Sequence, residues 1–210
     1  MTPNDLILYA ITDRSFLHKK PLEEAVREAI LGGATIVQLR EKSLKGDELK
    51  ALAIKVKEVC NWYNVPFIIN DDVILAKEIQ ADGVHVGQSD MAVSQARSIL
   101  GSDKIVGATA KTLEQAKEAE LAGADYLGSG AVFGTTTKAD AKPMSLELFT
   151  DICNHVDIPV VAIGGINIDN VENLKGTPLA GACFVSGIFG ASDITKTTGQ
   201  IKDKLLTFIS

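Results

Sequence analysis

Short runs of apolar residues recur along the whole chain, and residues that favour turns separate them. Continuous apolar runs of this length are typical of strands that are buried on both faces of a parallel sheet. The runs predict eight strands, over residues 6–11, 35–40, 66–69, 83–86, 105–108, 125–128, 160–163 and 182–185.

Between these runs, apolar residues return every three or four positions, which is the spacing of an amphipathic helix. The first such segment begins at Pro21, a residue favoured at the first helical position, and ends at the glycine pair 32–33. Thr112 and Gln115 form a capping-box pair at another helix start. Further helices are expected over about 49–60, from near Asp72, Ala92, Thr112, Ser145 and Ile168, and over about 193–209.

Eight strands that alternate with eight helices and lack a linker predict one α/β domain over residues 1–210. The expected fold is a closed parallel (β/α)₈ barrel, the TIM-barrel fold, and 210 residues is at the short end for it. An open doubly wound sheet is the alternative, although it usually has fewer strands.

A weak internal repeat supports the barrel. The segments 33–36, 81–84, 123–126 and 181–184 resemble one another, and each ends a helix and begins a strand. They precede strands two, four, six and eight, as duplication of a βαβα unit would produce. A small residue there allows a sharp turn from helix to strand.

Composition and charge restrict the partners. Hydrophobic residues make up 46% of the chain and charged residues 23%, as in ordinary globular proteins, and no apolar run is long enough to span a membrane. The formal charge of −6 argues against nucleic acid or an anionic membrane surface, but allows a small anionic substrate in a local cationic pocket. Three isolated cysteines and the lack of a signal peptide favour the cytoplasm, and association into a homo-oligomer is left open.

Chemistry is expected at the carboxyl ends of the barrel strands, where (β/α)₈ enzymes place their active sites. At the end of strand two, alternation puts Gln38, Arg40 and Lys42 on the inner face, while Leu39 faces the helices. Cations inside a barrel are costly unless they meet an anion. A bound anion is therefore the favoured interpretation, and an internal ion pair, for instance with Asp71, is the alternative.

Acidic residues follow the next two strands. Asp71 comes after strand three and Asp90 after strand four, and neighbouring strands lie about 5 Å apart. Mg²⁺ is usually held by one or two carboxylates together with phosphate oxygens and water. The two residues are therefore expected to share Mg²⁺, whereas Asp72 is expected to cap the following helix.

Two further features suggest phosphate sites. The longest loop at the barrel mouth follows strand six and contains Thr135, Thr136, Thr137 and Lys138, which offer hydroxyls and a cation. Gly164-Gly165 follows strand seven, and Val185-Ser186 ends strand eight. Barrels often bind a phosphate between the loops after strands seven and eight. A solvated polar loop remains the alternative for the segment after strand six.

The histidines suggest little chemistry. His18 and His155 are expected at the surface, and His85 is expected to be a hydrogen-bonded residue inside a strand rather than a base. Three scattered histidines and the absence of a cysteine cluster give no support for zinc.

Taken together in their order, these motifs resemble the thiamine phosphate synthase family over the whole chain. The resemblance rests on Gln38-Leu39-Arg40-Glu41-Lys42, Asn70-Asp71-Asp72, 82–88 with Asp90, 135–138, 164–166 and Val185-Ser186. It implies a transferase of thiamine biosynthesis that joins hydroxymethylpyrimidine pyrophosphate to a thiazole phosphate and releases pyrophosphate. The expected mechanism is a Mg²⁺-assisted dissociative substitution.

The same resemblance implies residue roles. Arg40, Lys42 and Lys138 act on the departing pyrophosphate, Gln38 and Asn70 join them in binding the pyrimidine substrate, and Asp71 and Asp90 bind Mg²⁺. The thiazole phosphate is expected on Thr135, Thr137, Gly165, Val185 and Ser186. Leu39, Glu41 and Thr136 belong to the same motifs and are included among the substrate-binding residues. Thr109 stands where the family commonly has serine, and it keeps the hydroxyl; Ala131 stands where many members have proline.

Three other functions are alternatives for a chain with this pattern. A thiazole tautomerase of the same family would lack the pyrophosphate and metal residues. The second is a barrel epimerase or aldolase that acts on a sugar phosphate. An aldolase would need a lysine within a strand for a Schiff base, and the predicted strands contain none. A noncatalytic binding protein would have no use for a complete charged site.

Overall fold

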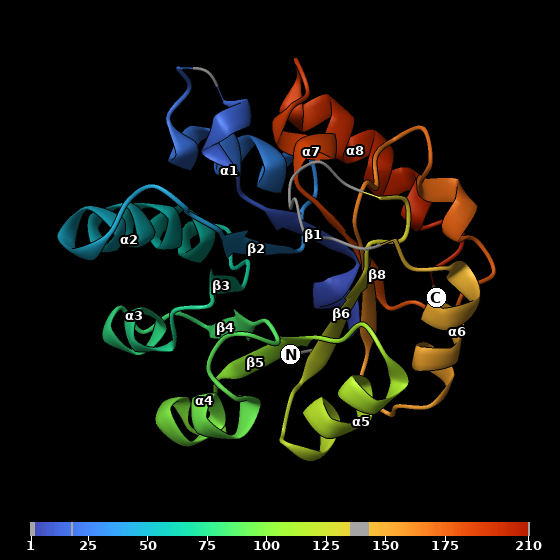
Figure 1. Ribbon diagram of the computed structural model, residues 1–210. Coiled ribbons are helices and arrows are strands. Elements are labelled where there is room, and N and C mark those ends of the chain that lie inside the picture. Colours follow the sequence, from blue (N-terminus) through green and yellow to red (C-terminus); the bar gives the residue numbers. More distant parts are fainter. Residues whose placement is uncertain (1–2, 18, 135–142, 210) are drawn as a thin grey trace.

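The computed structural model of the protein describes residues 3–17, 19–134 and 143–209. Eight parallel strands hydrogen-bond in chain order, and β8 closes the ring by pairing with β1. The expected closed (β/α)₈ barrel is therefore confirmed, with its strands in the centre of Figure 1. The strands are β1 (Leu8–Ile11), β2 (Ile36–Leu39), β3 (Phe67–Asn70), β4 (Gly83–Val86), β5 (Ile105–Thr109), β6 (Tyr126–Gly130), β7 (Val160–Ile163) and β8 (Gly181–Phe184).

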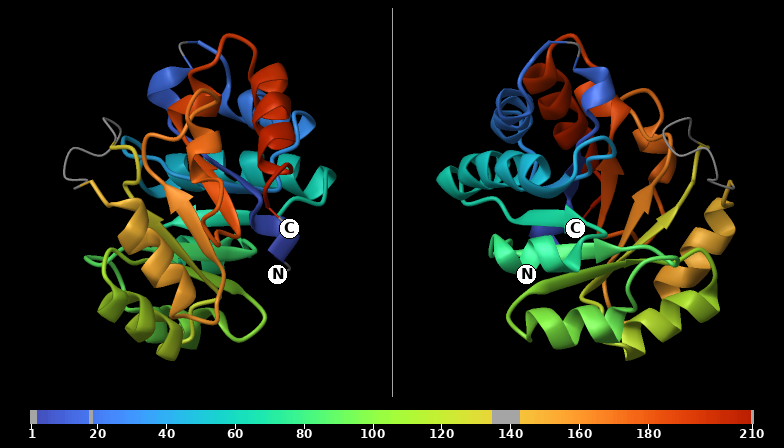
Figure 2. Two further views of the ribbon diagram at one scale, coloured as in Figure 1. Left: turned by 90° about the vertical axis from the view of Figure 1, so that its right-hand side faces the viewer. Right: turned by 60° about the vertical axis from the view of Figure 1, so that its left-hand side comes forward.

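Helices surround this ring, and both Figure 1 and Figure 2 show them on its outside. The α-helices are α1 (Leu22–Leu31), α2 (Gly46–Trp62), α3 (Val73–Glu78), α4 (Val93–Leu100), α5 (Leu113–Leu121), α6 (Leu146–Asn154), α7 (Ser186–Phe189) and α8 (Ile194–Leu205). Three 3₁₀ turns complete the described elements: η1 (Pro3–Leu6), η2 (Arg14–Phe16) and η3 (Val171–Leu174). None of the helices in these ranges is long and apolar enough to cross a bilayer.

The helices α1 and α5 begin close to the positions that the sequence predicts. Pro21 is the residue before α1 rather than its first residue. The Thr112 hydroxyl accepts a hydrogen bond from the Gln115 N–H (3.3 Å), as a capping box requires. The Gln115 side chain, however, accepts from the Lys111 N–H (2.8 Å), one residue before Thr112. The helix start is confirmed, and its reciprocal bond is displaced by one residue.

Several predicted elements differ in extent from the observed ones: β1 begins only at Leu8, because Leu6 belongs to η1, and two further differences lie around β8. The connection after β7 contains only the 3₁₀ turn η3 where a helix from near Ile168 was expected, because Gly176 (φ +90°) and Pro178 prevent its continuation. At β8, the strand ends at Phe184, and Ser186 already begins the four-residue helix α7. The carboxyl end of β8 therefore leads directly into a short extra helix.

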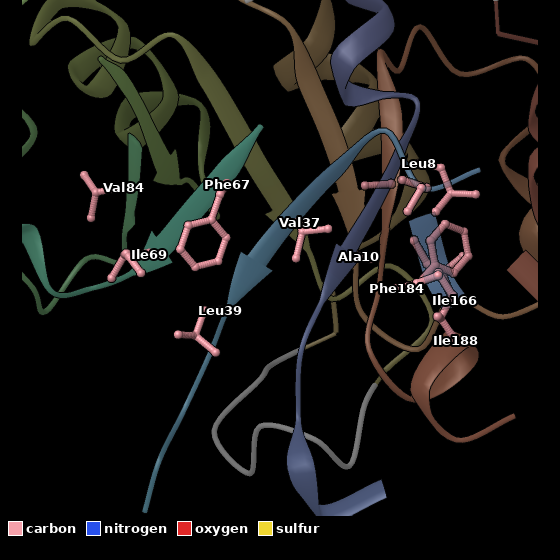
Figure 3. Close-up of a cluster of buried hydrophobic side chains, with 14 of the residues drawn as sticks. Leu8, Ala10, Val37, Leu39, Phe67, Ile69, Val84, Ile166, Phe184 and Ile188 are labelled. Atoms are coloured by element: carbon pink, nitrogen blue, oxygen red, sulfur yellow. The ribbon is translucent and has the colours of Figure 1, made fainter. Parts of the chain in front are cut away.

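Strand alternation divides the core into two layers. Val37 and Leu39 of β2 face outward and pack with Leu8, Ala10 and many helix residues in one continuous cluster (Figure 3). A smaller cluster fills the inside of the barrel and includes Tyr9, Ile36, Ile68, Tyr126 and Cys183. Leu6 of η1 joins the inner cluster and fills the amino-terminal end of the barrel. Side chains thus fill the barrel interior from its amino-terminal end up to the cavity at the carboxyl ends of the strands.

The structure confirms the internal repeat, but the structurally equivalent residues are not all those that the sequence similarity aligned. The residue before each of β2, β4 and β6 has a side chain that accepts a hydrogen bond from the backbone of the preceding strand. The three donor N–H groups and their acceptors are Leu8 to Thr35 (2.9 Å), Phe67 to Asp82 (2.8 Å) and Val106 to Asp125 (2.7 Å). The aligned segment at 81–84 is therefore shifted by one residue. The segment at 181–184 lies within β8 and lacks this hydrogen bond, because Ala180 stands in the equivalent place.

Candidate active site

A cavity opens at the carboxyl ends of the strands, where the fold predicts the active site. Each of the eight strands, or the residues just after it, contributes to its lining. Polar and charged side chains on its wall come from β1 to β5 and from the residue that begins α7 after β8, and glycines dominate the side formed by β6 and β7. The polar lining residues are Tyr9, Gln38, Arg40, Asn70, His85, Thr109, Lys111 and Ser186.

The β2 motif is divided as alternation predicts. Gln38 is buried and donates a hydrogen bond from Nε2 to the Tyr9 hydroxyl (2.8 Å). Arg40 lies at the cavity mouth, and its Nη1 is 3.4 Å from Asp13 Oδ2. The internal ion pair considered as an alternative therefore exists, but the acid is Asp13 rather than Asp71. Lys42 lines an adjoining pocket, which Arg40 also borders.

Leu39 and Glu41 do not line the cavity with their side chains. Leu39 packs in the outer hydrophobic layer (Figure 3), so that it could meet a substrate only through its backbone. Glu41 Oε1 accepts a hydrogen bond from the Ser43 N–H (2.7 Å), and Oε2 lies 2.6 Å from Arg14 Nε. Burial raises the pKa of this carboxyl, but the backbone N–H groups of Ser43 and Leu44 and the Arg14 charge outweigh burial and leave the pKa lowered. Glu41 thus holds the loop after β2 in place.

The two residues expected to bind the metal are both hydrogen-bonded to the end of β4, Asp71 through its backbone N–H and Asp90 through its carboxylate. The Asp71 N–H donates to the His85 carbonyl (2.8 Å), and Asp71 adopts φ +64°. Asp90 Oδ2 accepts from the Gly87 N–H (2.8 Å). Asp72 behaves differently, because its side chain accepts from the Leu75 N–H (2.8 Å) at the start of α3. The helix-capping role expected for Asp72 is confirmed.

Asn70 lines the cavity beside these acids. Its Nδ2 donates to Asp71 Oδ2 (2.6 Å), so that the amide and the carboxylate are held together at the end of β3. Within the described ranges, no group of three or more histidine, cysteine, aspartate or glutamate side chains gathers as a metal site. A metal held by Asp71 and Asp90 would therefore need further oxygen ligands from substrate or water, which is the arrangement that Mg²⁺ prefers.

The β5 end offers a hydroxyl and a cation. Thr109 Oγ1 lies 3.0 Å from His85 Nε2, and both residues line the cavity. His85 also contacts the Tyr126 hydroxyl through Nδ1 (3.0 Å), which confirms it as a hydrogen-bonded barrel residue. Lys111 lines the cavity as well and was missed in the sequence. The sequence could have identified it, because Lys111 lies two residues beyond Thr109 and alternation places both side chains on the same side of the strand.

Glycines shape the side of the cavity formed by β6 and β7. Gly164 (φ +105°) and Gly165 (φ +66°) have backbone conformations that side chains rarely adopt. A Cβ on Gly164 would meet Ala131, and one on Gly165 would meet the Gly134 carbonyl. The pair is therefore needed for the loop after β6 to pack on the turn after β7.

Gly165, Val185 and Ser186 all line the cavity, as the sequence predicted for a phosphate site between the last two loops. Val185 precedes the short helix α7, and Ser186 is its first residue. Two asparagine side chains reach the Gly165 carbonyl, with Asn170 Nδ2 at 2.8 Å and Asn167 Nδ2 at 3.5 Å. The remaining expected residues, Thr135, Thr136, Thr137 and Lys138, lie outside the described residues.

A polar cavity with a glycine-lined wall, set at the carboxyl ends of eight parallel strands, defines the class as a (β/α)₈-barrel enzyme. The family model for thiamine monophosphate synthase matches residues 8–188. The chain therefore belongs to the thiamine monophosphate synthase family.

Individual relatives agree with this assignment. The chain is 47% identical to a thiamine-phosphate synthase of Fusobacterium nucleatum over 96% of this chain and 98% of that protein. It is 48% identical to a thiamine-phosphate synthase of Ruminiclostridium cellulolyticum over 94% of each. Among solved structures, thiamine phosphate pyrophosphorylase from Pyrococcus furiosus matches with a TM-score of 0.90 and 40% identity over 98% of both chains.

Proposed function

We propose that the protein catalyses the thiamine-phosphate synthase reaction. It joins the methylene of a 4-amino-2-methyl-5-hydroxymethylpyrimidine pyrophosphate to the ring nitrogen of a thiazole phosphate and releases pyrophosphate. The observation that carries the proposal is the cavity, whose lining contains Gln38, Arg40, Asn70, Gly165 and Ser186. These are among the residues that the family resemblance assigns to the two substrates, and the family model covers all five.

The pyrimidine pyrophosphate would occupy the β2–β3 side of the cavity. Gln38 and Asn70 would bind it there, and the cations Arg40, Lys42 and Lys138 would neutralise its phosphates. Arg40 borders both the cavity and the adjoining pocket that contains Lys42, which supports a pyrophosphate that extends from one into the other. Charge-assisted hydrogen bonds from such groups are about twice as strong as neutral ones.

The thiazole phosphate would lie on the opposite wall. Its phosphate would rest on Gly165, Val185 and Ser186, and Thr135 and Thr137 would contact it from the loop after β6. This wall consists largely of backbone and small side chains, which suits a ring that must approach the pyrimidine closely.

Asp71 and Asp90 would hold Mg²⁺ together with pyrophosphate oxygens and water. Carboxylate oxygens are the ligand type that the ion prefers, and both acids are anchored through β4. The bound ion would add positive charge next to the pyrophosphate. The chain's own residues Asn70 and Arg40 would orient the same phosphates.

The chemistry would be a dissociative substitution. The bond between the pyrimidine methylene and the pyrophosphate oxygen breaks with both electrons on the oxygen, and the aminopyrimidine ring stabilises the resulting cation. The lone pair of the thiazole nitrogen then forms the new C–N bond. This sequence needs no base or nucleophile from the protein, so that the chain's contribution is charge neutralisation and positioning.

We further propose that the protein works in the cytoplasm on these two small molecules. Cys60 and Cys183 are buried and Cys153 is half-buried, and all three are free. Burial raises the pKa of each thiol, to about 12 for Cys153, which keeps them unreactive.

One assay tests the function. Purified protein is incubated with the pyrimidine pyrophosphate, the thiazole phosphate and Mg²⁺, and both pyrophosphate and thiamine phosphate are quantified. Equimolar formation of the two products, which requires all three components, is expected. Turnover of a sugar phosphate in place of this pair, or full activity in EDTA, would contradict the proposal.

A further inference from the structure

A chain of hydrogen bonds crosses the barrel interior directly below the cavity. Gln38 Nε2 contacts the Tyr9 hydroxyl (2.8 Å), which contacts the Tyr126 hydroxyl (2.7 Å). Tyr126 contacts His85 Nδ1 (3.0 Å), and His85 Nε2 contacts Thr109 Oγ1 (3.0 Å). The five residues come from five different strands, and both ends of the chain, Gln38 and Thr109, line the cavity.

The barrel wall is shaped to hold these rings. A Cβ on Gly107 of β5 would run into the Tyr126 ring, and a Cβ on Gly128 of β6 would come within 3.2 Å of His85 Cε1. Tyr126 also packs against the rings of Tyr9 and His85, with centroid distances of 5.9 and 5.5 Å. The rings therefore have little freedom to turn away from one another.

The chain has a preferred direction because an amide NH₂ can only donate. Gln38 donates to Tyr9, Tyr9 donates to Tyr126, and Tyr126 donates to His85 Nδ1. His85 then carries its proton on Nε2 and donates it to Thr109. In this arrangement each phenol accepts one hydrogen bond and donates one, so that both buried hydroxyl protons have an acceptor.

The opposite direction, in which Tyr126 donates to Tyr9, would leave the Tyr9 hydroxyl proton unpaired. If Tyr126 donated to Tyr9, the Tyr9 proton would have no acceptor within the described residues, although its side chain is only 1% exposed. An unpaired buried donor is disfavoured. Burial raises the pKa of Tyr9 and of Tyr126, so that neither becomes a phenolate that could accept twice.

We infer that Tyr9, Tyr126 and His85 are positioning residues that determine which hydrogen-bonding group each end of the chain presents to the substrate. With Nε2 engaged by Tyr9, Gln38 offers its carbonyl oxygen as an acceptor. With Oγ1 accepting from His85, Thr109 offers its own proton as a donor. An acceptor and a donor on one wall match a ring that carries an amine next to a ring nitrogen, which is the edge of an aminopyrimidine.

This inference rests on the proposed function for the identity of the substrate, and the first test is kinetic. Tyr9→Phe frees the Gln38 amide to rotate, and Tyr126→Phe interrupts the chain at its centre. Each variant should raise the KM for the pyrimidine pyrophosphate about 10-fold, with the KM for the thiazole phosphate unchanged. Tyr63→Phe is the matched control, because Tyr63 is the third tyrosine of the chain and lies at the end of α2.

A substrate analogue distinguishes positioning from general stabilisation. An oxo group in place of the exocyclic amine reverses the donor and acceptor on that edge. The wild-type enzyme should discriminate against this pyrophosphate by at least 10-fold in inhibition constant, and Tyr9→Phe should lose most of the discrimination. A folded Tyr9→Phe variant that keeps both its KM and its discrimination would overturn the inference.

The second test needs no substrate. The chain has three histidines, so that ¹⁵N NMR of the rings is tractable, and His85→Gln assigns the His85 signals by their loss. His85 should be neutral with its proton on Nε2, and Tyr126→Phe should shift the Nδ1 resonance. A proton on Nδ1 in the wild-type protein would overturn the inferred direction. This result is independent of whether thiamine phosphate forms, so that failure of the proposed function would be recognised separately.

Discussion

At the scale of single residues, the Thr109 hydroxyl both contacts His85 and faces the cavity. The hydroxyl meets His85 Nε2 at 3.0 Å and also lines the cavity, whereas the methyl group of Thr109 has no corresponding chemical role. The family commonly has serine at this position, which shares only the hydroxyl. The hydroxyl is therefore the part of Thr109 on which binding should depend.

Thr109→Ser should keep kcat/KM within about 2-fold, because the hydrogen bond to His85 is retained. Thr109→Val keeps the shape but removes the hydroxyl, and it should lower kcat/KM at least 10-fold and the free energy of unfolding by about 1 kcal/mol. Steady-state kinetics and urea denaturation measure the two effects. Equal kinetics for the serine and valine variants would assign Thr109 to packing alone.

Three neighbouring aspartates allow a similarly controlled test of the proposed metal site. Asp71→Asn and Asp90→Asn should each abolish Mg²⁺-dependent pyrophosphate release while leaving the protein folded, because a neutral amide is a poor ligand for Mg²⁺. Asp72→Asn is the control: Asp72 caps α3, and asparagine caps a helix equally well. Unchanged Mg²⁺ titration curves for the Asp71 and Asp90 variants would remove these residues from the metal site.

Alternation along a strand predicted which way side chains face. It could not predict which side chains from distant parts of the sequence contact each other. The period of two correctly placed Gln38 inside the barrel and Leu39 in the outer layer. It could not identify Asp13 as the partner of Arg40, because the two residues are 27 positions apart and follow different strands. The Tyr9–Tyr126 contact spans 117 positions and was missed for the same reason.

At the scale of elements, the connection between β7 and β8 depends on glycine both for backbone conformation and for packing. Gly165 (φ +66°) and Gly176 (φ +90°) both lie in the connection between β7 and β8. A Cβ on Gly165 would meet the Gly134 carbonyl, whereas nothing lies within 4 Å of a Cβ on Gly176. The pair therefore separates the cost of backbone strain from the cost of a steric clash.

Gly165→Ala and Gly176→Ala should each lose about 1–2 kcal/mol of unfolding free energy from the left-handed conformation. Only Gly165→Ala should also displace the loop after β6 and raise the KM for the thiazole phosphate, by about 10-fold or more. Denaturation and steady-state kinetics on both variants check this. Identical kinetic effects at the two positions would show that the contact with Gly134 is unimportant.

Element positions followed well from the hydrophobic pattern, since buried strands and amphipathic helices differ in period. Element ends did not, because they depend on local backbone chemistry. The helix expected from near Ile168 is the turn η3, and the repeated helix-to-strand turns align through Thr35, Asp82 and Asp125 rather than through their small neighbours. In those three turns the repeated feature is a side-chain hydrogen bond, which a search for similar residues detects only approximately.

At the scale of the whole molecule, the two ends of the barrel have different roles. The cavity occupies the carboxyl ends of the strands, and the opposite end contains the helix-to-strand turns that hold neighbouring units together. Arg97 of α4 is the most heavily engaged side chain of that end among the described residues. Its guanidinium donates to the carbonyls of Gly101 (3.0 Å), Lys104 (2.5 Å) and Gly123 (2.9 Å) and to Asp125 Oδ2 (2.6 Å).

Arg97→Gln should therefore test whether stability and catalysis are separable in this barrel. Glutamine cannot reach all four acceptors, so that the turns before β5 and β6 lose their common partner, and the unfolding free energy should fall by about 2–3 kcal/mol. Both KM values and kcat should stay within about 2-fold at a temperature where the variant is folded, because Arg97 does not line the cavity. Arg27→Gln controls for the lost charge: Arg27 is exposed on α1, and its change should alter stability by no more than about 0.5 kcal/mol. An equal loss of stability in the control, or a raised KM in Arg97→Gln, would show that the two ends of the barrel are not independent.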